Sequence, residues 1–249
     1  MACAEGSLHG FPASLTSFVG RAQATHQIAA QLAEYRLVTL AGPGGAGKTR
    51  LAGEVAKQVA GRFADGVWLA ELAAVRDPAQ VPAAVAAALG IHDLPAVAAS
   101  DALAQALARR QLLLVLDNCE QVIGAVAEVC GRLLLGADDV RVLATSREPL
   151  RIAGEVRYRL GPLTLPDPGK PGNPDDLAGS EAESEAVTLF ADRARRAEPS
   201  FTLDAPTRKT VDQLVARLDG MPLAIELAAA RVEALGAARS EERRVGKEC

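Results

Sequence analysis

The segment from Leu37 to Thr49 constrains the fold of this chain more than any other feature. It begins with the short apolar run LVTLA and continues directly into the glycine-rich turn GPGGAGKT. The run predicts a buried strand, because it is short and has a β-branched residue at its centre. Helical spacing of apolar residues then returns between Arg50 and Ala60. A strand, a glycine-rich turn and a helix in this order predict the first unit of an α/β domain.

The turn matches the pattern G-x-x-x-x-G-K-[ST], in which successive backbone N–H groups point inward at phosphate oxygens. The positive N-terminal end of the following helix adds to the attraction. We expect Lys48 to reach the β- and γ-phosphates of a nucleoside triphosphate and the Thr49 hydroxyl to ligate Mg²⁺. The predicted nucleotide-binding residues of this loop are Gly42, Pro43, Gly44, Gly45, Ala46, Gly47, Lys48, Thr49 and Arg50.

Further strands and helices alternate along the chain, which predicts an open parallel sheet covered by helices on both faces. The predicted strands are 37–41, 66–72, 112–116, 140–145 and 156–160. After a proline- and glycine-rich break the pattern is helical only, near 183–197, 206–218 and 222–235. The predicted organisation is a lead-in (1–16), a P-loop nucleotide-binding domain (17–161), a linker (162–182), a helical subdomain (183–238) and a tail (239–249).

Asp117 ends the apolar run LLLVL, a predicted buried strand. Ligands of open α/β sheets bind at the carboxyl ends of the strands, so Asp117 is a candidate to hold Mg²⁺ as a Walker B acid. The next residue is Asn118, where many ATPases have an acid that polarises water. Glu120 is a candidate catalytic base, although it could equally be a carboxylate at the start of a helix.

Arg147 follows the next predicted strand, in the sequence Thr145-Ser146-Arg147. If this strand lies between the P-loop strand and the Asp117 strand, Arg147 faces the γ-phosphate. There it could sense that phosphate or stabilise charge during its transfer. The alternative is a salt bridge from Arg147 to Glu148 or Glu155.

Composition excludes several other classes of protein. The formal net charge of −4 and the acids near each arginine cluster do not support a nucleic-acid-binding surface. The four cysteines form no C-x-x-C pair, which argues against a zinc site or a disulfide framework. The chain shows no secretory signal and no apolar stretch long enough to span a bilayer, so we expect a cytoplasmic protein.

Together the motifs resemble the STAND class of P-loop ATPases, an NB-ARC-like group. The ATPase modules of large bacterial regulators, of the LuxR and SARP types, are the most similar. The matching segments are LTSFVGR (15–21), VTLAGPGGAGKTRLA (38–52), LVLDNCEQ (114–121), RVLATSREPL (141–150) and GMPLAIELAAAR (220–231). They occur in the family's order and extend over most of the chain.

The resemblance implies roles that spacing alone does not indicate. Val19 and Arg21 would lie against the adenine and ribose, and Pro222 would pack on the base from the helical subdomain. Arg147 would be the sensor arginine. Members of this class work as switches: ADP holds a closed form, and exchange for ATP permits opening and often self-association. Shifting a population from 1:99 to 99:1 requires about 5.5 kcal/mol of differential binding, which here must come from contacts to the γ-phosphate.

The resemblance also implies that the chain is truncated at its C-terminus, because family members continue into a winged-helix domain and helical repeats. The last segment, RSEERRVGKEC (239–249), breaks sharply from the Ala- and Leu-rich sequence before it and resembles translated adapter sequence. We therefore expect this tail not to be native.

The sequence thus favours an ATP/ADP-binding regulatory switch with slow hydrolysis, in a multidomain signalling or transcriptional regulator. The alternative is a turnover P-loop ATPase or kinase of another family. GTP specificity is disfavoured because the N-K-x-D motif is absent. The chain has no helix-turn-helix and no basic face, so we expect no direct contact with nucleic acid or membrane.

Overall fold

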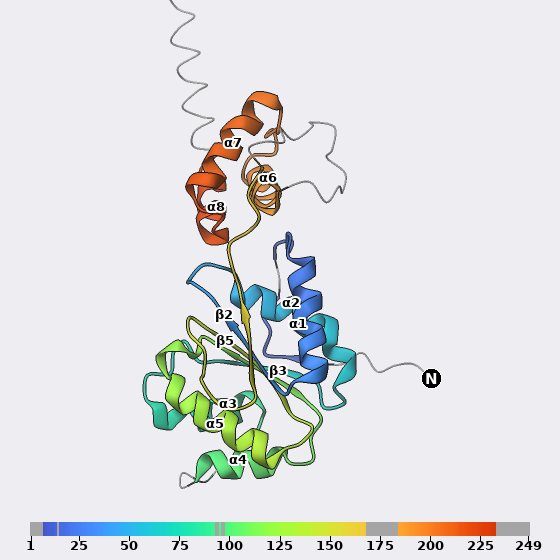
Figure 1. The fold of residues 1–249 in the computed structure, drawn as a ribbon, viewed down its shortest axis with the longest axis vertical. Coiled ribbons are helices and arrows are strands. Elements are labelled where there is room, and N and C mark those ends of the chain that lie inside the picture. The colour runs from blue at the N-terminus through green and yellow to red at the C-terminus, as the bar shows by residue number, and fades with distance from the viewer. Residues whose placement is uncertain (1–6, 14, 93–94, 96–97, 168–183, 233–249) are drawn as a thin grey trace, which may run out of the picture. The chain divides into compact units, whose positions relative to one another are not determined.

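The computed structural model describes residues 7–13, 15–92, 95, 98–167 and 184–232 (Figure 1). The chain divides into two compact units. The first comprises residues 1–18, 22–44 and 48–160, and the second comprises residues 19–21, 45–47 and 161–249. The predicted tail lies outside the described residues, as does most of the predicted linker.

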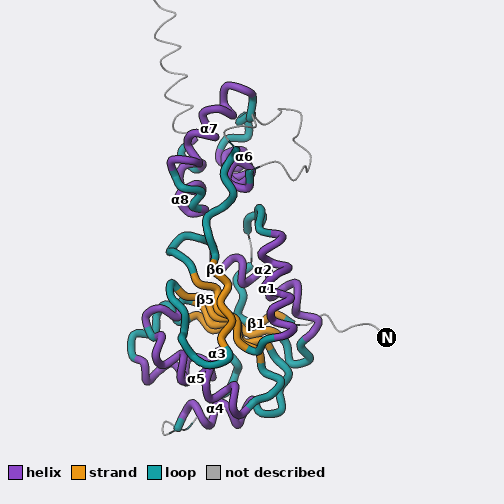
Figure 2. Tube along the Cα trace, in the orientation of Figure 1, coloured by secondary structure: helices purple, strands orange, loops and turns teal. Residues whose placement is uncertain are grey.

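The first unit is built on a six-stranded sheet in which every described neighbour pair is parallel (Figure 2). The strands are β1 (Leu8–His9), β2 (Leu37–Ala41), β3 (Val67–Glu71), β4 (Leu113–Asp117), β5 (Arg141–Ser146) and β6 (Glu155–Arg159). Their order across the sheet is β1-β3-β4-β5-β2-β6. Strand β5 therefore lies between the P-loop strand β2 and the Asp117 strand β4, which is the arrangement that brings Arg147 toward the loop.

Helices cover both faces of this sheet, as the sequence predicted (Figure 1). Helices α1 (Ala22–Glu34) and α2 (Lys48–Val59) pack against one face, and α3 (Val81–Ala88), α4 (Ala99–Leu107) and α5 (Ile123–Gly136) pack against the other. Alternate residues of a strand point to opposite faces. Accordingly, alternate residues of β4, Leu114 and Leu116, belong to the buried cluster under α3–α5. All five residues of β4 are buried, so both faces of this strand are covered.

The predicted lead-in contains a short strand that the sequence analysis did not predict. Leu8 and His9 pair with Val67 and Trp68 of β3, and the His9 and Trp68 rings stack with centroids 3.8 Å apart. A two-residue strand is too short to show alternation, which explains why the pattern did not indicate it.

In the part of the second unit that the structure describes, three helices surround a core of their own, so the fold prediction of a small helical region after the sheet is confirmed. The helices are α6 (Glu185–Ala197), α7 (Ala205–Arg217) and α8 (Pro222–Ala229). Ser184 caps α6 by accepting from the Val187 N–H, and Asp204 caps α7 by accepting from the Thr207 N–H. The core contains Leu163, Ala186, Val187, Leu189, Phe190, Ala194, Val211, Val215, Ile225 and Ala229. None of the helices within the described ranges is long and apolar enough to cross a membrane.

Candidate nucleotide-binding site

The glycine-rich turn connects β2 to α2 and requires glycine at particular positions. A Cβ added at Gly42 would lie 2.6 Å from the Leu160 carbonyl oxygen, so only glycine fits there. Gly45 and Gly47 have φ angles of +76° and +84°, a conformation that L-residues with side chains rarely adopt. The turn is fixed to the sheet by a hydrogen bond of 3.2 Å from the Gly42 N–H to the Ser146 carbonyl. These constraints produce the curled backbone that a phosphate-binding loop needs.

Lys48 is the first residue of α2 and its ammonium group lies inside the turn. Its Nζ donates to the carbonyl oxygens of Gly42 and Pro43, at 2.9 and 3.0 Å. Burial lowers the pKa of Lys48, and nearby Arg147 lowers it further, while Glu120 and Asp117 oppose the shift. Lys48 therefore lies within electrostatic reach of Asp117, Glu120 and Arg147.

Asp117 lies at the carboxyl end of β4 and is only 2% exposed. Its carboxylate accepts hydrogen bonds from the Thr49 hydroxyl, at 2.8 Å to Oδ1 and 2.9 Å to Oδ2. The Thr145 hydroxyl also donates to Asp117 Oδ1 and accepts from the Asn118 N–H at 3.1 Å. Two residues that the sequence assigned to Mg²⁺, 68 positions apart, thus meet side by side.

Arg147 follows β5 and forms an ion pair with Glu120, with 3.1 Å between Arg147 Nε and Glu120 Oε1. Its guanidinium lies over the turn, since a Cβ added at Gly44 would be 3.7 Å from Arg147 Nη2. The alternative partners considered from the sequence are engaged elsewhere. Glu148 pairs with Arg151, and Glu155 pairs with Arg157.

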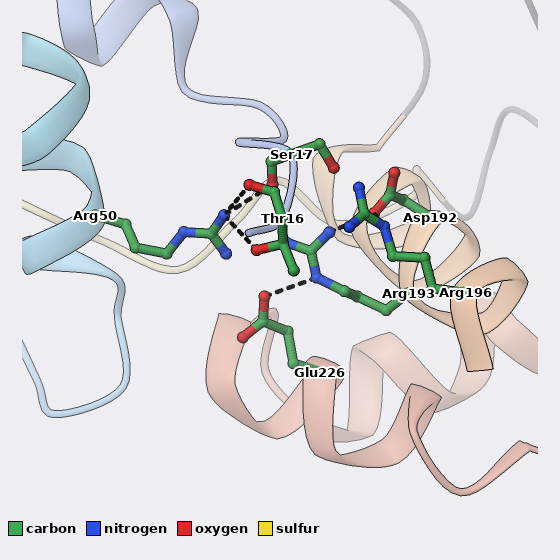
Figure 3. A network of polar contacts seen from close by, with 7 residues as sticks. All are labelled: Thr16, Ser17, Arg50, Asp192, Arg193, Arg196 and Glu226. Atoms are coloured by element: carbon green, nitrogen blue, oxygen red, sulfur yellow. Dashed lines mark hydrogen bonds and ion pairs between the residues drawn. The ribbon is translucent and has the colours of Figure 1, made fainter. Parts of the chain in front are cut away.

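The Arg50 side chain extends toward Thr16 and Ser17 of the N-terminal segment (Figure 3). Its Nη2 donates to the carbonyl oxygens of Thr16 and Ser17, at 3.0 and 2.8 Å, and to the Thr16 hydroxyl at 2.9 Å. These hydrogen bonds form a clasp between Arg50 and the N-terminal segment. Beside the clasp lies a cavity of about 270 Å³, whose lining includes Phe11, Pro12, Ala13, Leu15, several residues of α2 and Asp117. The Arg50 side chain therefore fastens the segment before Val19 to the helix that carries Lys48 and Thr49.

Val19, Arg21 and Pro222 all belong to the second unit, which also includes the Gly45–Gly47 part of the turn. Val19 packs against the helical core. Arg21 has a φ of +61°, its N–H donates to Glu185, and its Nη2 donates to the Gly161 carbonyl at 2.9 Å. Pro222 begins α8, and the next N–H, that of Leu223, donates to the Gly45 carbonyl at 3.2 Å.

Comparison with known proteins decides the family. The family described as Novel STAND NTPase 1 matches residues 9–152, more than half of the chain. The chain belongs to this family. A match that begins near β1 and ends after β5 includes the phosphate-binding turn, Asp117 and Arg147.

This STAND NTPase is similar to parts of longer proteins. An uncharacterized protein of Mycobacterium tuberculosis is 39% identical over 227 residues, which are 91% of this chain and 53% of the relative. A "Putative HTH-type transcriptional regulator" of the same species is 41% identical over 206 residues, 83% of this chain and 21% of the relative. The STAND NTPase thus spans about half the length of the first relative and about a fifth of the second.

Solved structures support the fold. A Signal Transduction ATPase with Numerous Domains from Pyrococcus horikoshii, with a tetratricopeptide repeat sensor, has a TM-score of 0.52 at 17% identity, covering 86% of this chain and 30% of that one. Cdc6p from Pyrobaculum aerophilum has a TM-score of 0.58 at 15% identity, covering 89% of this chain and 65% of that one. At these identities the likeness concerns the fold alone.

The residues of the STAND NTPase fit a magnesium nucleotide. Among the described residues, no group of three or more His, Cys, Asp and Glu side chains could hold a metal ion alone. Thr49 and Asp117 instead offer a hydroxyl and a carboxylate, which are hard oxygen ligands. Magnesium in nucleotide sites characteristically binds to one or two such groups and takes its other ligands from phosphates and water.

Two polar arrangements were missed from the sequence, one at the site and one within the helical unit. The Thr145 hydroxyl, which orients Asp117, could have been suspected because Thr145 ends the strand beside β4. Arg193 could not have been singled out by its spacing, although it is only 9% exposed and joins α6 to α8 through Glu226 at 2.9 Å (Figure 3). The same arginine pairs with Asp192, which also pairs with Arg196.

Proposed function

We propose that this chain binds ATP and ADP with Mg²⁺ and acts as a slowly hydrolysing switch module of a multidomain signalling or transcriptional regulator. The observation that carries the proposal is the hydrogen bond between Thr49 and Asp117 beside the phosphate-binding turn. Family membership as a STAND NTPase supports nucleotide binding in general. The link to transcription rests on the regulator relative, of which this chain matches about a fifth.

In this proposal the backbone N–H groups of the turn and the Lys48 ammonium bind the phosphates. Thr49 and Asp117 hold Mg²⁺, which neutralises phosphate charge when bound. The hydrogen bonds from Lys48 to the loop carbonyls hold its charge inside the turn. Preorganisation of this kind reduces the entropic cost of binding.

Base and ribose contacts are assigned to Val19, Arg21 and Pro222. The support is that all three belong to one unit with the Gly45–Gly47 turn, and that Leu223 is hydrogen-bonded to Gly45. The clasp from Arg50 to Thr16 and Ser17 holds the segment just before Val19. We further propose that the full-length protein self-associates in its ATP form.

Slow hydrolysis follows from the surroundings of Asp117. Asn118 offers an amide where many ATPases have an acid, and the nearby carboxylate of Glu120 is ion-paired with Arg147. A turnover P-loop ATPase or kinase of another family is the alternative function, and it would require Glu120 to act as the general base in place of the missing acid at Asn118.

Calorimetric titration of the full chain with ADP, ATP and GTP in the presence of Mg²⁺ tests the proposal. We expect binding that is selective for adenine nucleotides and lost in Lys48→Ala. Glu54→Gln is a matched control, because Glu54 lies on α2 and pairs with Lys57 on its surface. If a folded sample binds no nucleotide, or binds GTP as well as ATP, the proposal is wrong.

A further inference from the structure

Glu120 is brought near the turn by the backbone that follows β4. Asn118 has a φ of +60°, and the short 3₁₀ helix η3 (Cys119–Gln121) comes next. This reversal lets Glu120 pair with Arg147 at 3.1 Å, although the two residues follow different strands. The pairing depends on the order of the sheet, in which β4 and β5 are neighbours.

The two side chains of this pair lie in different environments. The Glu120 side chain is 18% exposed, whereas that of Arg147 is 68% exposed. The second carboxylate oxygen, Glu120 Oε2, is buried and has no hydrogen-bond partner among the described residues. A carboxylate in this position depends on its arginine for compensation, since an uncompensated buried charge is costly.

Arg147 also lies where a second anion would compete for it. Its guanidinium lies over Gly44, and its charge acts on Lys48 together with those of Glu120 and Asp117. The motif assigns the terminal phosphate of a triphosphate to Lys48. An exposed arginine that is paired with a carboxylate and lies over the predicted phosphate-binding turn has two candidate partners, and it cannot satisfy both fully.

We propose that Glu120 is a positioning residue that competes with the γ-phosphate for Arg147 and thereby sets the preference of the site for ADP over ATP. With ADP, the Arg147–Glu120 pair stays intact. With ATP, Arg147 turns to the γ-phosphate and Glu120 loses its partner. The free-energy cost of breaking the ion pair lowers the net affinity for ATP. The inference rests on the proposed nucleotide switch and gives Glu120 a role other than catalytic base.

The test uses Glu120→Gln in the full chain, titrated with ADP and with the β,γ-imido analogue of ATP, both with Mg²⁺. We expect the variant to bind the ATP analogue about three- to tenfold more tightly, with a change in ADP affinity below about twofold. Removing any negative charge near a phosphate could increase affinity nonspecifically. Glu148→Gln is the matched control for this effect, because Glu148 is the next residue after Arg147 and pairs with Arg151. We expect its effect on either ligand to stay below about twofold.

A double-mutant cycle separates positioning from a structural role. On an Arg147→Ala background, Glu120→Gln is expected to change the affinity ratio by less than about twofold, because there is no arginine left to release. A purely structural effect would shift the melting temperature and both affinities together. Unchanged or weaker binding of the ATP analogue by Glu120→Gln, or an equal gain in Glu148→Gln, overturns the proposal even when wild type binds normally. Lack of binding by wild type instead overturns the proposed function itself.

Discussion

Two polar clusters at the carboxyl edge of the sheet differ in how they are held. Asp117 is 2% exposed and is bound by the neutral hydroxyls of Thr49 and Thr145. Arg147 is 68% exposed and is bound by one charged partner, Glu120. Hydrogen bonds within a buried cluster fix geometry, whereas exposed ion pairs contribute little to stability and exchange partners easily. We infer that the Asp117 cluster is a rigid anchor and that Arg147 is the movable element.

The largest effect is expected from breaking the anchor. Asp117→Asn keeps the size of the side chain but removes the carboxylate, so the proposed Mg²⁺ site would lose its charged ligand. We expect the affinity for Mg²⁺–ATP to fall about 100-fold or more. The measurement is titration with and without EDTA. The loss should largely disappear in EDTA, and an equal loss in both conditions would show that Asp117 does not act through the metal.

The next effect concerns the hydroxyl that orients Asp117. Thr145→Val has a similar shape, but it leaves the Asn118 N–H without its partner and removes one of the two hydroxyls that donate to Asp117 Oδ1. We expect about 1–3 kcal/mol less unfolding free energy and about tenfold weaker Mg²⁺–ATP binding. Urea denaturation and calorimetry measure the two quantities, and Thr145→Ser, which keeps the hydroxyl, is the control. If Ser and Val variants behaved alike, the methyl group rather than the hydroxyl would be responsible.

Arg50 is intermediate between the Asp117 cluster and the Arg147–Glu120 pair, because it is a charged side chain that donates to the neutral oxygens of Thr16 and Ser17. Arg50→Met removes the bonds to Thr16 and Ser17 while keeping an apolar stem. We expect about 1 kcal/mol lower stability and faster protease cleavage before Phe18. Arg62→Met is a suitable control, since Arg62 donates to the Ala29 carbonyl at 3.0 Å, on α1. Equal cleavage of both variants would contradict a local clasp.

The smallest effect is a dependence of stability on pH that comes from Lys48. Its folded-state pKa is lowered below 10.5, mainly by burial. The unfolded chain therefore binds more protons in the interval just below pH 10.5, and the free energy of unfolding should rise with pH there. Lys48→Met should remove this rise. The comparison requires denaturation of both proteins from pH 8 upward, and a difference that is constant with pH would argue against the lowered pKa.

The sequence was sufficient to predict the phosphate-binding turn and the sheet, because both have local signatures. The turn requires glycine at positions that a pattern records, and β4 is apolar on both faces. The partner of Arg147 was not predictable in the same way. Glu148 and Glu155 were the candidates by proximity, whereas the observed partner, Glu120, depends on the left-handed residue Asn118 and the turn after it. A turn of this kind has no periodicity, so its effect on side-chain direction appears only in three dimensions.

The position of β2 in the sheet has a consequence for hydrogen exchange. It is flanked on both sides, by β5 and β6, whereas β1 contributes only two residues at the edge. Amides of β2 should therefore exchange only through the largest opening events of the first unit, while those of β1 exchange through local fraying. The end of β2, which leads into the phosphate-binding turn, therefore stays protected from exchange during smaller, local openings. Those largest openings would also release a bound nucleotide, so nucleotide binding should increase the protection of Leu37–Ala41 and leave that of β1 nearly unchanged.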